Sequence, residues 1–330
     1  MTINDGVLKR SDLGSDRKNK DKKSMKHVLK GDLVYNPMFM WKGASGISSY
    51  EGITSADYIV LKSKKNVNQI FFSHLFQTEK SLNKFKNYSQ GSLLERLRLM
   101  YPQFSDIKMA FPSYEEQEKI ANFLTSVDNK IELLEKKYQS YLNFKKYLMQ
   151  QIFAQKLRFD FKIFKLKELS KINKGKQLNK DDMLENGKYY VLNGGKEPSG
   201  YTNEWNTLEN TITISEGGNS CGFVNFNEEK FWSGGHCYYL SNLSKNVDDY
   251  YLFSYLKFIE PKIMRLRVGS GLPNIQKGDI ENIKIKILPM NEQLKISNLL
   301  LSMDKKVNSI AIQKENIKIF KKGLLQQMFV

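Results

Sequence analysis

The chain has 330 residues, enough for two or three domains of ordinary size, and 40% of them are hydrophobic, which is enough to bury real cores. No apolar run approaches the length of a membrane span, and the N-terminus lacks the apolar stretch of a signal peptide, so we expect a globular, cytoplasmic protein. The 52 Lys and Arg exceed the 35 Asp and Glu, giving a net charge of +17. This excess favours a polyanionic partner such as nucleic acid, although a lysine-rich proteome would produce it too.

In chain order, the sequence alternates between β-rich domains and long helices. Both β-rich stretches contain many Tyr, Phe, Ile, Gly and Asn, and segments such as "NTITISEGGNSCGFVNF" and "KFWSGGHCYYL" are typical of short strands separated by turns. The predicted fold class is therefore α+β. The predicted boundaries are 1–113 for the first domain, 114–156 for the central helix, 157–288 for the second domain and 289–330 for the C-terminal helix.

The two predicted helices are copies of one another. Residues 116–153 and 292–329 align without a gap at an offset of 176, with 16 identities in 38 positions. Apolar residues recur at alternating steps of four and three in both copies, which forms a heptad seam. We expect the helices to pair within the chain, although a coiled coil between chains could use the same seam. About 40 helical residues form a rod of about 60 Å.

The two β-rich domains differ at their start. The segment "GASG" ending at Gly46 matches "NSCG" ending at Gly222, again at an offset of 176. The opening stretch of the second domain, "FKIFKLKELSKINKG", has no obvious counterpart in the first domain. We therefore expect the first domain to be shortened at its N-terminus by at least one element.

Two phosphate-binding motifs are missing from the sequence. The chain has no phosphate-binding loop of the G-x-x-x-x-G-K-[ST] type and no G-x-G-x-x-G after a strand. "YNPMF" only superficially resembles the N-P-P-Y/F element of amino-methyltransferases. The two cysteines, Cys221 and Cys237, lack zinc-finger spacing, so buried thiols beside a hydrogen-bonded His236 are favoured over a metal site.

The ordered set of segments resembles the specificity subunit of type I restriction–modification systems. The resemblance rests on "VLKGDLVYNPMF", "SYEGITSADYIVL", "VLNGGKEPSGYTNEW", "SEGGNSCGFVNF", "FWSGGHCYYL" and "VGSGLPNIQKGDIENIKIKILP", and above all on the two "EQ…I…L…D" helices. It covers essentially the whole chain.

The resemblance implies two mostly β target-recognition domains and two long helices that pair as an antiparallel coiled coil with a pseudo-two-fold repeat. It implies a subunit without catalytic activity that binds double-stranded DNA and docks two modification (methyltransferase) subunits, and through them restriction subunits. S-adenosylmethionine, ATP and Mg would belong to those partners. Two recognition domains on a spacer predict a bipartite DNA target. Its two half-sites would be separated by at most roughly 17 base pairs.

Polar and basic residues near Gly-rich turns are candidate DNA contacts, because Arg suits guanine and Asn suits adenine. A surface or turn role remains an alternative for each of them. The candidates are Lys174, Lys176, Asn193, Asn219, Ser220, His236, Arg265, Arg267, Ser270 and Asn274 in the second domain, and Asn36, Lys42, Ser92, Arg96 and Arg98 in the first.

Polar residues repeated in both helices predict two equivalent docking surfaces for two equal subunits. Helix capping and solvated charge are the alternative explanation. The docking candidates are Glu116, Gln117, Asp128, Glu292, Gln293 and Asp304. A different function, that of a scaffold or donor of recognition domains without independent DNA reading, also stays open because the first domain is shortened.

Overall fold

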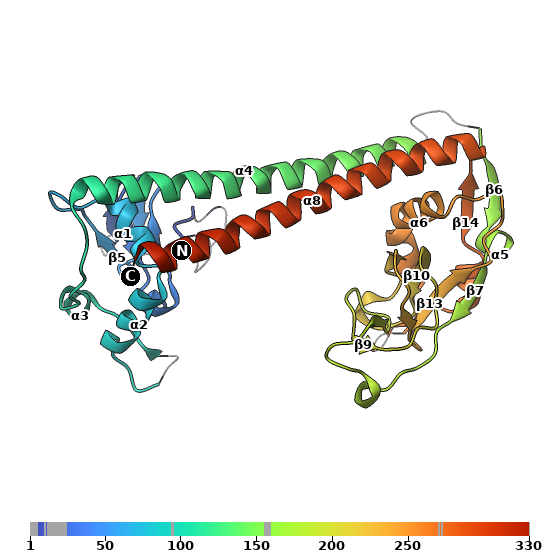
Figure 1. Ribbon diagram of the computed structural model, residues 1–330, viewed down its shortest axis with the longest axis horizontal. Coiled ribbons are helices and arrows are strands. Elements are labelled where there is room, and N and C mark those ends of the chain that lie inside the picture. The colour runs from blue at the N-terminus through green and yellow to red at the C-terminus, as the bar shows by residue number, and fades with distance from the viewer. Residues whose placement is uncertain are drawn as a thin grey trace. The chain divides into compact units, whose positions relative to one another are not determined.

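In the computed structural model, the described residues are 6–9, 11, 25–93, 96–154, 160–269, 271 and 273–329. The chain divides into two compact units: unit 1 comprises Met1–Lys136 and Ala311–Val330, and unit 2 comprises Lys137–Ile310. Helices and sheets occur in both, so the predicted α+β class is confirmed (Figure 1). Each unit includes part of both long helices, unlike the predicted domains, because helix side chains complete both cores.

The long helices α4 and α8 pair along their predicted seam. They span Tyr114–Phe153 and Met290–Met328. Seam residues Leu124 and Leu300 are fully buried. Within unit 1, Lys321 of α8 pairs with Asp128 of α4, and Lys314 pairs with Glu135. The position on α8 falls as the position on α4 rises, so the helices run antiparallel, as predicted (Figure 1).

Unit 1 contains a three-stranded antiparallel sheet in the order β3-β2-β5 and a separate pair, β1 with β4. Helices α1, α2 and α4 supply Phe71, Phe85 and Leu124 to its core, which also contains Tyr35 of β2. The bounds are β1 Lys26–Val28, β2 Leu33–Tyr35, η2 Met40–Lys42, β3 Ser45–Ile47, β4 Gly52–Thr54, β5 Ile59–Leu61, α1 Gln69–Leu75, α2 Glu79–Tyr88 and α3 Tyr101–Ser105.

Unit 2 contains a four-stranded antiparallel sheet in the order β11-β10-β13-β7, a sheet β12-β8-β9 and a pair β14-β6. Strand β10 is buried along its whole length, in keeping with its apolar and Thr-rich sequence TITIS. The strand bounds are β6 Lys162–Lys165, β7 Lys171–Lys174, β8 Tyr189–Leu192, β9 Gly200–Thr202, β10 Thr211–Ser215, β11 Val224–Asn227, β12 Trp232–Ser233, β13 Cys237–Ser241 and β14 Lys284–Ile287.

Helix α6 covers the large sheet of unit 2 and packs its aromatic side chains against the end of α4. Phe153 contacts the rings of Tyr251, Tyr255 and Phe258 at centroid distances of 5.4 to 5.7 Å. The helical bounds are α5 Leu166–Leu169, η4 Lys180–Asp182, η5 Gly218–Ser220, α6 Asp249–Ile263, η6 Met264–Leu266 and α7 Lys277–Glu281. None of the described helices combines the length and hydropathy that crossing a membrane requires.

The two units share a framework but not all of its parts. The order β3-β2-β5 followed by α1 corresponds to β11-β10-β13 followed by α6. In unit 2 the strand β7 extends the sheet beyond β13, and β6 pairs with β14. Among the described residues of unit 1, no strand takes either place.

Candidate nucleic-acid interface

Loops next to three strands of unit 2, β7 and β13 of one sheet and β8 of another, meet in one place. The amide of Lys176, after β7, donates to the carbonyl of Ser233 at 2.9 Å. The amide of His236, before β13, donates to Oδ1 of Asn193, after β8, at 3.3 Å. Gly194 has φ +82°, and a Cβ there would lie 2.5 Å from the His236 carbonyl. The structure therefore brings Lys176, Asn193 and His236 together in one loop cluster.

A buried carboxylate, that of Glu216, lies behind these loops. Glu216 directly follows β10 and is only 4% exposed. Its Oε1 accepts from Lys174 Nζ at 2.6 Å and from the hydroxyl of Tyr238 at 3.1 Å, and His236 Nδ1 lies 3.5 Å from Oε2. Burial, together with this carboxylate, raises the pKa of Tyr238, which stays a hydrogen-bond donor. Glu216 thus holds Lys174 and lies close to His236, and it is a site residue that the sequence analysis missed.

The turn after Glu216 joins the loop cluster to the segment before α7. The amide of Gly218 donates to the carbonyl of Pro273 at 3.0 Å, and Asn274 forms bridges with Gly217 and Val268. Asn219 is exposed and Ser220 half-buried in η5 of this turn.

Two exposed arginines, Arg265 and Arg267, follow α6 beside the same turn. Gly222, with φ +85°, explains the close approach, because a Cβ there would lie 2.9 Å from the backbone of Met264. The tenth candidate of the second domain, Ser270, lies outside the described residues.

The unit 1 candidates occupy two adjoining loops. Asn36 Oδ1 accepts from the amide of Met38 at 3.0 Å, which is a turn role. The amide of Leu99 donates to the carbonyl of Pro37 at 2.9 Å, so the exposed Arg98 lies next to that turn. Arg96 and Ser92 are exposed in the preceding loop.

The remaining unit 1 candidate, Lys42, is exposed, and its ammonium lies 4.8 Å from the centre of the Trp41 ring. Lys86 approaches the same ring at 5.8 Å. Unit 1 therefore presents basic and aromatic side chains together, a combination that suits nucleic acid.

Two predicted docking residues are internal and cannot contact another subunit. Gln117 is 1% exposed and Gln293 is 0% exposed. Gln117 Oε1 accepts from the amide of Asn68, the N-cap of α1, and Gln293 Oε1 accepts from the amide of Asp248, the N-cap of α6, both at 3.0 Å. Their repetition in the sequence is therefore explained by one buried joint that occurs in each unit, the hydrogen bond between the glutamine of the long helix and the N-cap amide of the helix after the sheet.

Asp128 and Asp304 also have partners within the chain. Asp304 pairs with Lys145 of α4 and accepts from the hydroxyl of Tyr250. Asp128 pairs with Lys321, the repeat counterpart of Lys145. The lysines that interrupt the seam thus neutralise carboxylates on the facing helix, which argues against these aspartates as free docking groups.

The glutamates at the helix starts remain at the surface. The side chains of Glu116 and Glu292 are 51% and 30% exposed, and each lies within 4 Å of a lysine three residues on. Of the six docking candidates, only these two keep an accessible carboxylate that is not used in the helix pair.

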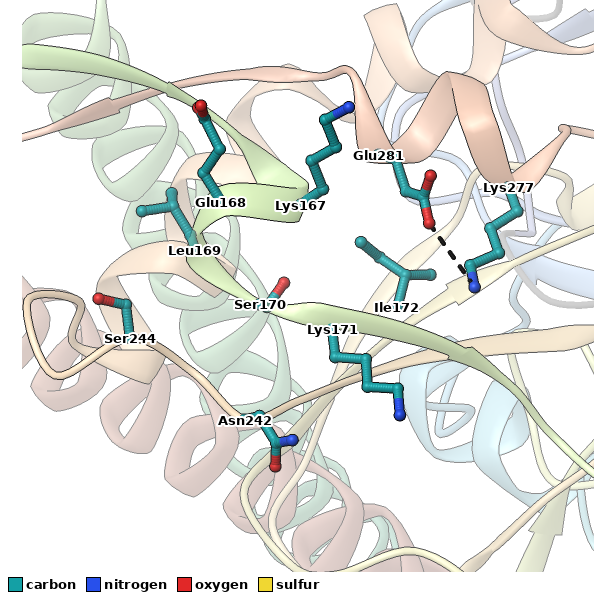
Figure 2. A pocket seen from close by; sticks show the side chains of 10 residues that line it. All are labelled: Lys167, Glu168, Leu169, Ser170, Lys171, Ile172, Asn242, Ser244, Lys277 and Glu281. Atoms are coloured by element: carbon teal, nitrogen blue, oxygen red, sulfur yellow. Dashed lines mark ion pairs between the residues drawn. The ribbon is translucent and has the colours of Figure 1, made fainter.

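Unit 2 also has an open cavity of about 370 Å³ around α5, β7 and α7, but its charged groups offer no catalytic arrangement. Figure 2 shows Lys277 and Glu281 facing each other from α7, with Nζ and Oε1 3.6 Å apart. Glu168 accepts from the amide of Lys165 at 2.5 Å. In the described part of the chain, no group of three His, Cys, Asp or Glu could hold a metal ion.

The two thiols are buried, as the spacing favoured. Burial raises the pKa of Cys237 to about 11 and also raises that of Cys221. Neither thiol is therefore activated as a nucleophile.

Comparison with known proteins identifies relatives over most of the chain. The family model described as type I restriction modification DNA specificity domain matches residues 12–140 and 159–319. A Methanocaldococcus jannaschii protein, described as a type I restriction enzyme MjaX specificity subunit, is 25% identical over 98% of this chain and 84% of its own length. A type I specificity subunit description also belongs to a Mycoplasma pneumoniae protein that is 33% identical over 44% of this chain and 39% of its own length.

Solved structures show the same fold. A type I restriction–modification S subunit from M. genitalium superposes with a TM-score of 0.72 at 17% identity, covering 92% of this chain and 84% of that one. A second structure, from work on assembly and conformational transition of the type I system, gives a TM-score of 0.56 at 16% identity, covering 92% of this chain and 83% of that one.

Proposed function

Because this chain belongs to the type I restriction–modification DNA specificity family, we propose that it selects the DNA sequence on which a type I restriction–modification complex acts. The observation that carries the proposal is the loop cluster of unit 2, where loops distant in sequence present Lys176, Asn193 and His236 at one surface. Such loops can combine phosphate contacts, which position the protein, with side chains that read base edges.

The second half of the proposal is a bipartite target. Unit 1 has its own exposed basic surface around Arg98 and Lys42, so each unit would read one half-site. The bases between the half-sites would go unread. Continuous helices run from one unit into the other and would set the spacing between the half-sites.

The partners follow from the same proposal. The chain itself would be non-catalytic and would work in the cytoplasm, where it would dock two adenine-methyltransferase subunits and, through them, restriction subunits. S-adenosylmethionine, ATP and Mg would be bound by those subunits. Glu116 and Glu292 are the repeated helix residues that keep exposed carboxylates for such docking.

Methylation mapping tests the proposal. The chain is co-expressed with its modification subunit, and methylated positions are compared with those of a variant whose residues 157–288 come from another family member. We expect exactly one half of a bipartite motif to change. A swap that leaves both halves intact would show that unit 2 does not read DNA.

A point variant sharpens the test. Asn219→Ala, at an exposed position of η5, should relax base preference at one position by tenfold or more, since a good bidentate contact contributes about 1–3 kcal/mol of discrimination. Asn246→Ala, exposed beside the start of α6, is the matched control and should leave the motif unchanged.

A scaffold or donor of recognition domains without independent DNA reading is a second candidate. The smaller sheet of unit 1, whose described strands end at β5, favours it. Binding of the modification subunit without sequence-selective binding of DNA would support this alternative, and a methylation motif with two defined halves would exclude it.

A further inference from the structure

In unit 2, one continuous segment closes two strand edges. The segment β6–α5–β7, residues 162–174, pairs through β6 with β14 and through β7 with β13. Between the two strands, Leu166 and Leu169 of α5 are 0% and 3% exposed and join the core that contains Phe153 at the end of α4. This closing segment therefore supplies both hydrogen bonds and apolar cover.

Among the described residues of unit 1, no segment covers either of the corresponding edges. The counterpart of β14 is the edge segment, residues 108–111, which leads into α4 as β14 leads into α8. Among the described residues, the one recorded backbone hydrogen bond of the edge segment is that of the Lys108 carbonyl, which accepts from Lys84 Nζ at 2.8 Å. Likewise, no described strand lies beyond β5, where β7 would lie in unit 2.

Matching apolar residues are also less buried in unit 1 than in unit 2. Ile287 of β14 is 6% exposed, whereas its counterpart Phe111 is 53% exposed. Ile152 and Phe153 at the end of α4 are buried, whereas their counterparts at the end of α8, Met328 and Phe329, are half-buried. Apolar positions that are buried in unit 2, where the closing segment is present, are thus more accessible in unit 1.

A cavity of about 320 Å³ adjoins the edge segment. Lys80 and Lys84 also line it. Its apolar lining comes from α1, the edge segment and the end of α8, and comprises Phe71, Leu75, Met109, Phe111, Met328 and Phe329. Apolar side chains from an added strand would fill this space, while its backbone paired with the edge segment.

We propose that unit 1 is a strand-addition site for a segment of a partner polypeptide with the chemistry of β6–α5–β7. The segment has two adjacent apolar residues flanked by lysines and then carries two leucines one helical turn apart, as the closing segment of unit 2 does. A second copy of this chain has its own segment already paired with β14 and β13, so we take a segment of a different polypeptide as the occupant.

The register of the added strand follows from unit 2. Phe164 lies opposite Ile285, whose counterpart is Met109. The amide of Leu166 donates to the carbonyl of Ile283. Hydrogen-bonded pairs alternate along an antiparallel ladder. The amide of Phe164 therefore faces the partner strand, whereas that of Ile163 points away from it.

Two N-methylated peptides test this geometry. The probe is a labelled peptide of residues 160–175 of this chain, added to the full-length protein without DNA, with binding followed by fluorescence anisotropy. We expect saturable binding, weakened about tenfold or more by N-methylation at Phe164 and left within about twofold by N-methylation at Ile163. Absence of binding by the unmodified peptide, or equal effects of the two methyl groups, overturns the proposal.

Two protein variants test the receiving edge. Phe111→Pro removes the ring and the amide donor, whereas Phe111→Ala removes the ring alone, and thermal melting shows whether both stay folded. We expect Phe111→Pro to bind the peptide about tenfold more weakly than Phe111→Ala. Equal affinities of the two variants for the peptide would contradict strand addition. If the chain forms a dimer without the peptide, and only Phe111→Pro abolishes that dimer, the occupant is a second copy and the choice of occupant is overturned.

Discussion

Units 1 and 2 anchor the helix that follows the sheet in the same way but close their sheets differently. In each, a buried glutamine of a long helix holds the N-cap amide of the helix that follows the sheet, Gln117 for α1 and Gln293 for α6. The sheet of unit 2 has β7 beyond β13, whereas the described strands of the unit 1 sheet end at β5. The joint to the long helix is therefore common to the two units, and the outer strands are where they have diverged.

Replacing the buried glutamines should have the largest effect on stability. Besides the cap amide, Gln293 donates to the carbonyl of Leu288 at 2.8 Å, and Leu288 is buried. Gln117 donates to the carbonyl of Pro112 at 2.9 Å, and Pro112 is exposed, so water can replace that bond. We expect Gln293→Leu to lower the free energy of unfolding by roughly 3 kcal/mol and Gln117→Leu by roughly 2 kcal/mol.

Urea unfolding of both variants measures this difference. Glu292→Gln and Glu116→Gln, at neighbouring positions that are more accessible than the glutamines, are the controls and should change stability by less than about 0.5 kcal/mol. Equal losses of unfolding free energy in the two glutamine variants would show that the Pro112 and Leu288 carbonyls are equally shielded from water. The expected difference between the two units would then be wrong.

A pH-dependent loss of stability should arise in unit 1 at His74. This side chain is 8% exposed in α1, and burial, reinforced by the Lys321 ammonium, lowers its pKa from 6.5 to about 4, while Asp128 acts in the opposite direction. The unfolded chain binds the proton more readily, so the contribution of His74 is complete above pH 6.5 and is lost as the pH falls towards 4. The loss is roughly 3 kcal/mol at most.

The measurement is the pH dependence of unfolding for the wild type and His74→Gln. Carboxylates titrate in the same window in both proteins, so the difference between the two curves reports His74. We expect the variant to lack the steeper fall between pH 6.5 and 4. Parallel curves would show that the histidine is protonated in the folded state or already open to water. Helix α6 contains no histidine, so unit 2 has no such step there.

The sequence predicted the features that repeat and missed those that depend on distant contacts. The offset of 176, the heptad seam and the two-domain plan required only that one half be compared with the other. The role of Gln117 could not be found in this way, because its partner Asn68 lies 49 residues earlier. The repeated glutamines therefore looked like surface residues held for a partner.

Glu216 was missed for a related reason. It stands between an apolar strand and a pair of glycines, where acidic residues usually mark exposed turns. Its burial depends on β7, β13 and the loop before β13, which meet only in the folded sheet. The candidates Lys174 and His236 were found by composition, but the carboxylate that holds Lys174 and lies close to His236 was not.

The smallest effect concerns the two equivalent ion pairs between α4 and α8. The Lys145 and Asp304 side chains are 19% and 33% exposed, against 23% and 40% for Lys321 and Asp128. Double-mutant cycles with alanine should give a coupling free energy of about 1 kcal/mol for the unit 2 pair and somewhat less for the unit 1 pair, because the latter is more hydrated. Both couplings should shrink in 1 M salt.

Tyr250 provides the control for this last comparison, since its hydroxyl donates to Asp304 and would inflate the unit 2 value. Repeating the unit 2 cycle in a Tyr250→Phe background isolates the lysine contribution. If the coupling then falls to that of the unit 1 pair, the difference between the units comes from the tyrosine and not from the burial of the ion pair. If the unit 2 coupling stays larger, burial sets the strength of the pair, and the seam lysines hold the helix register more firmly in unit 2.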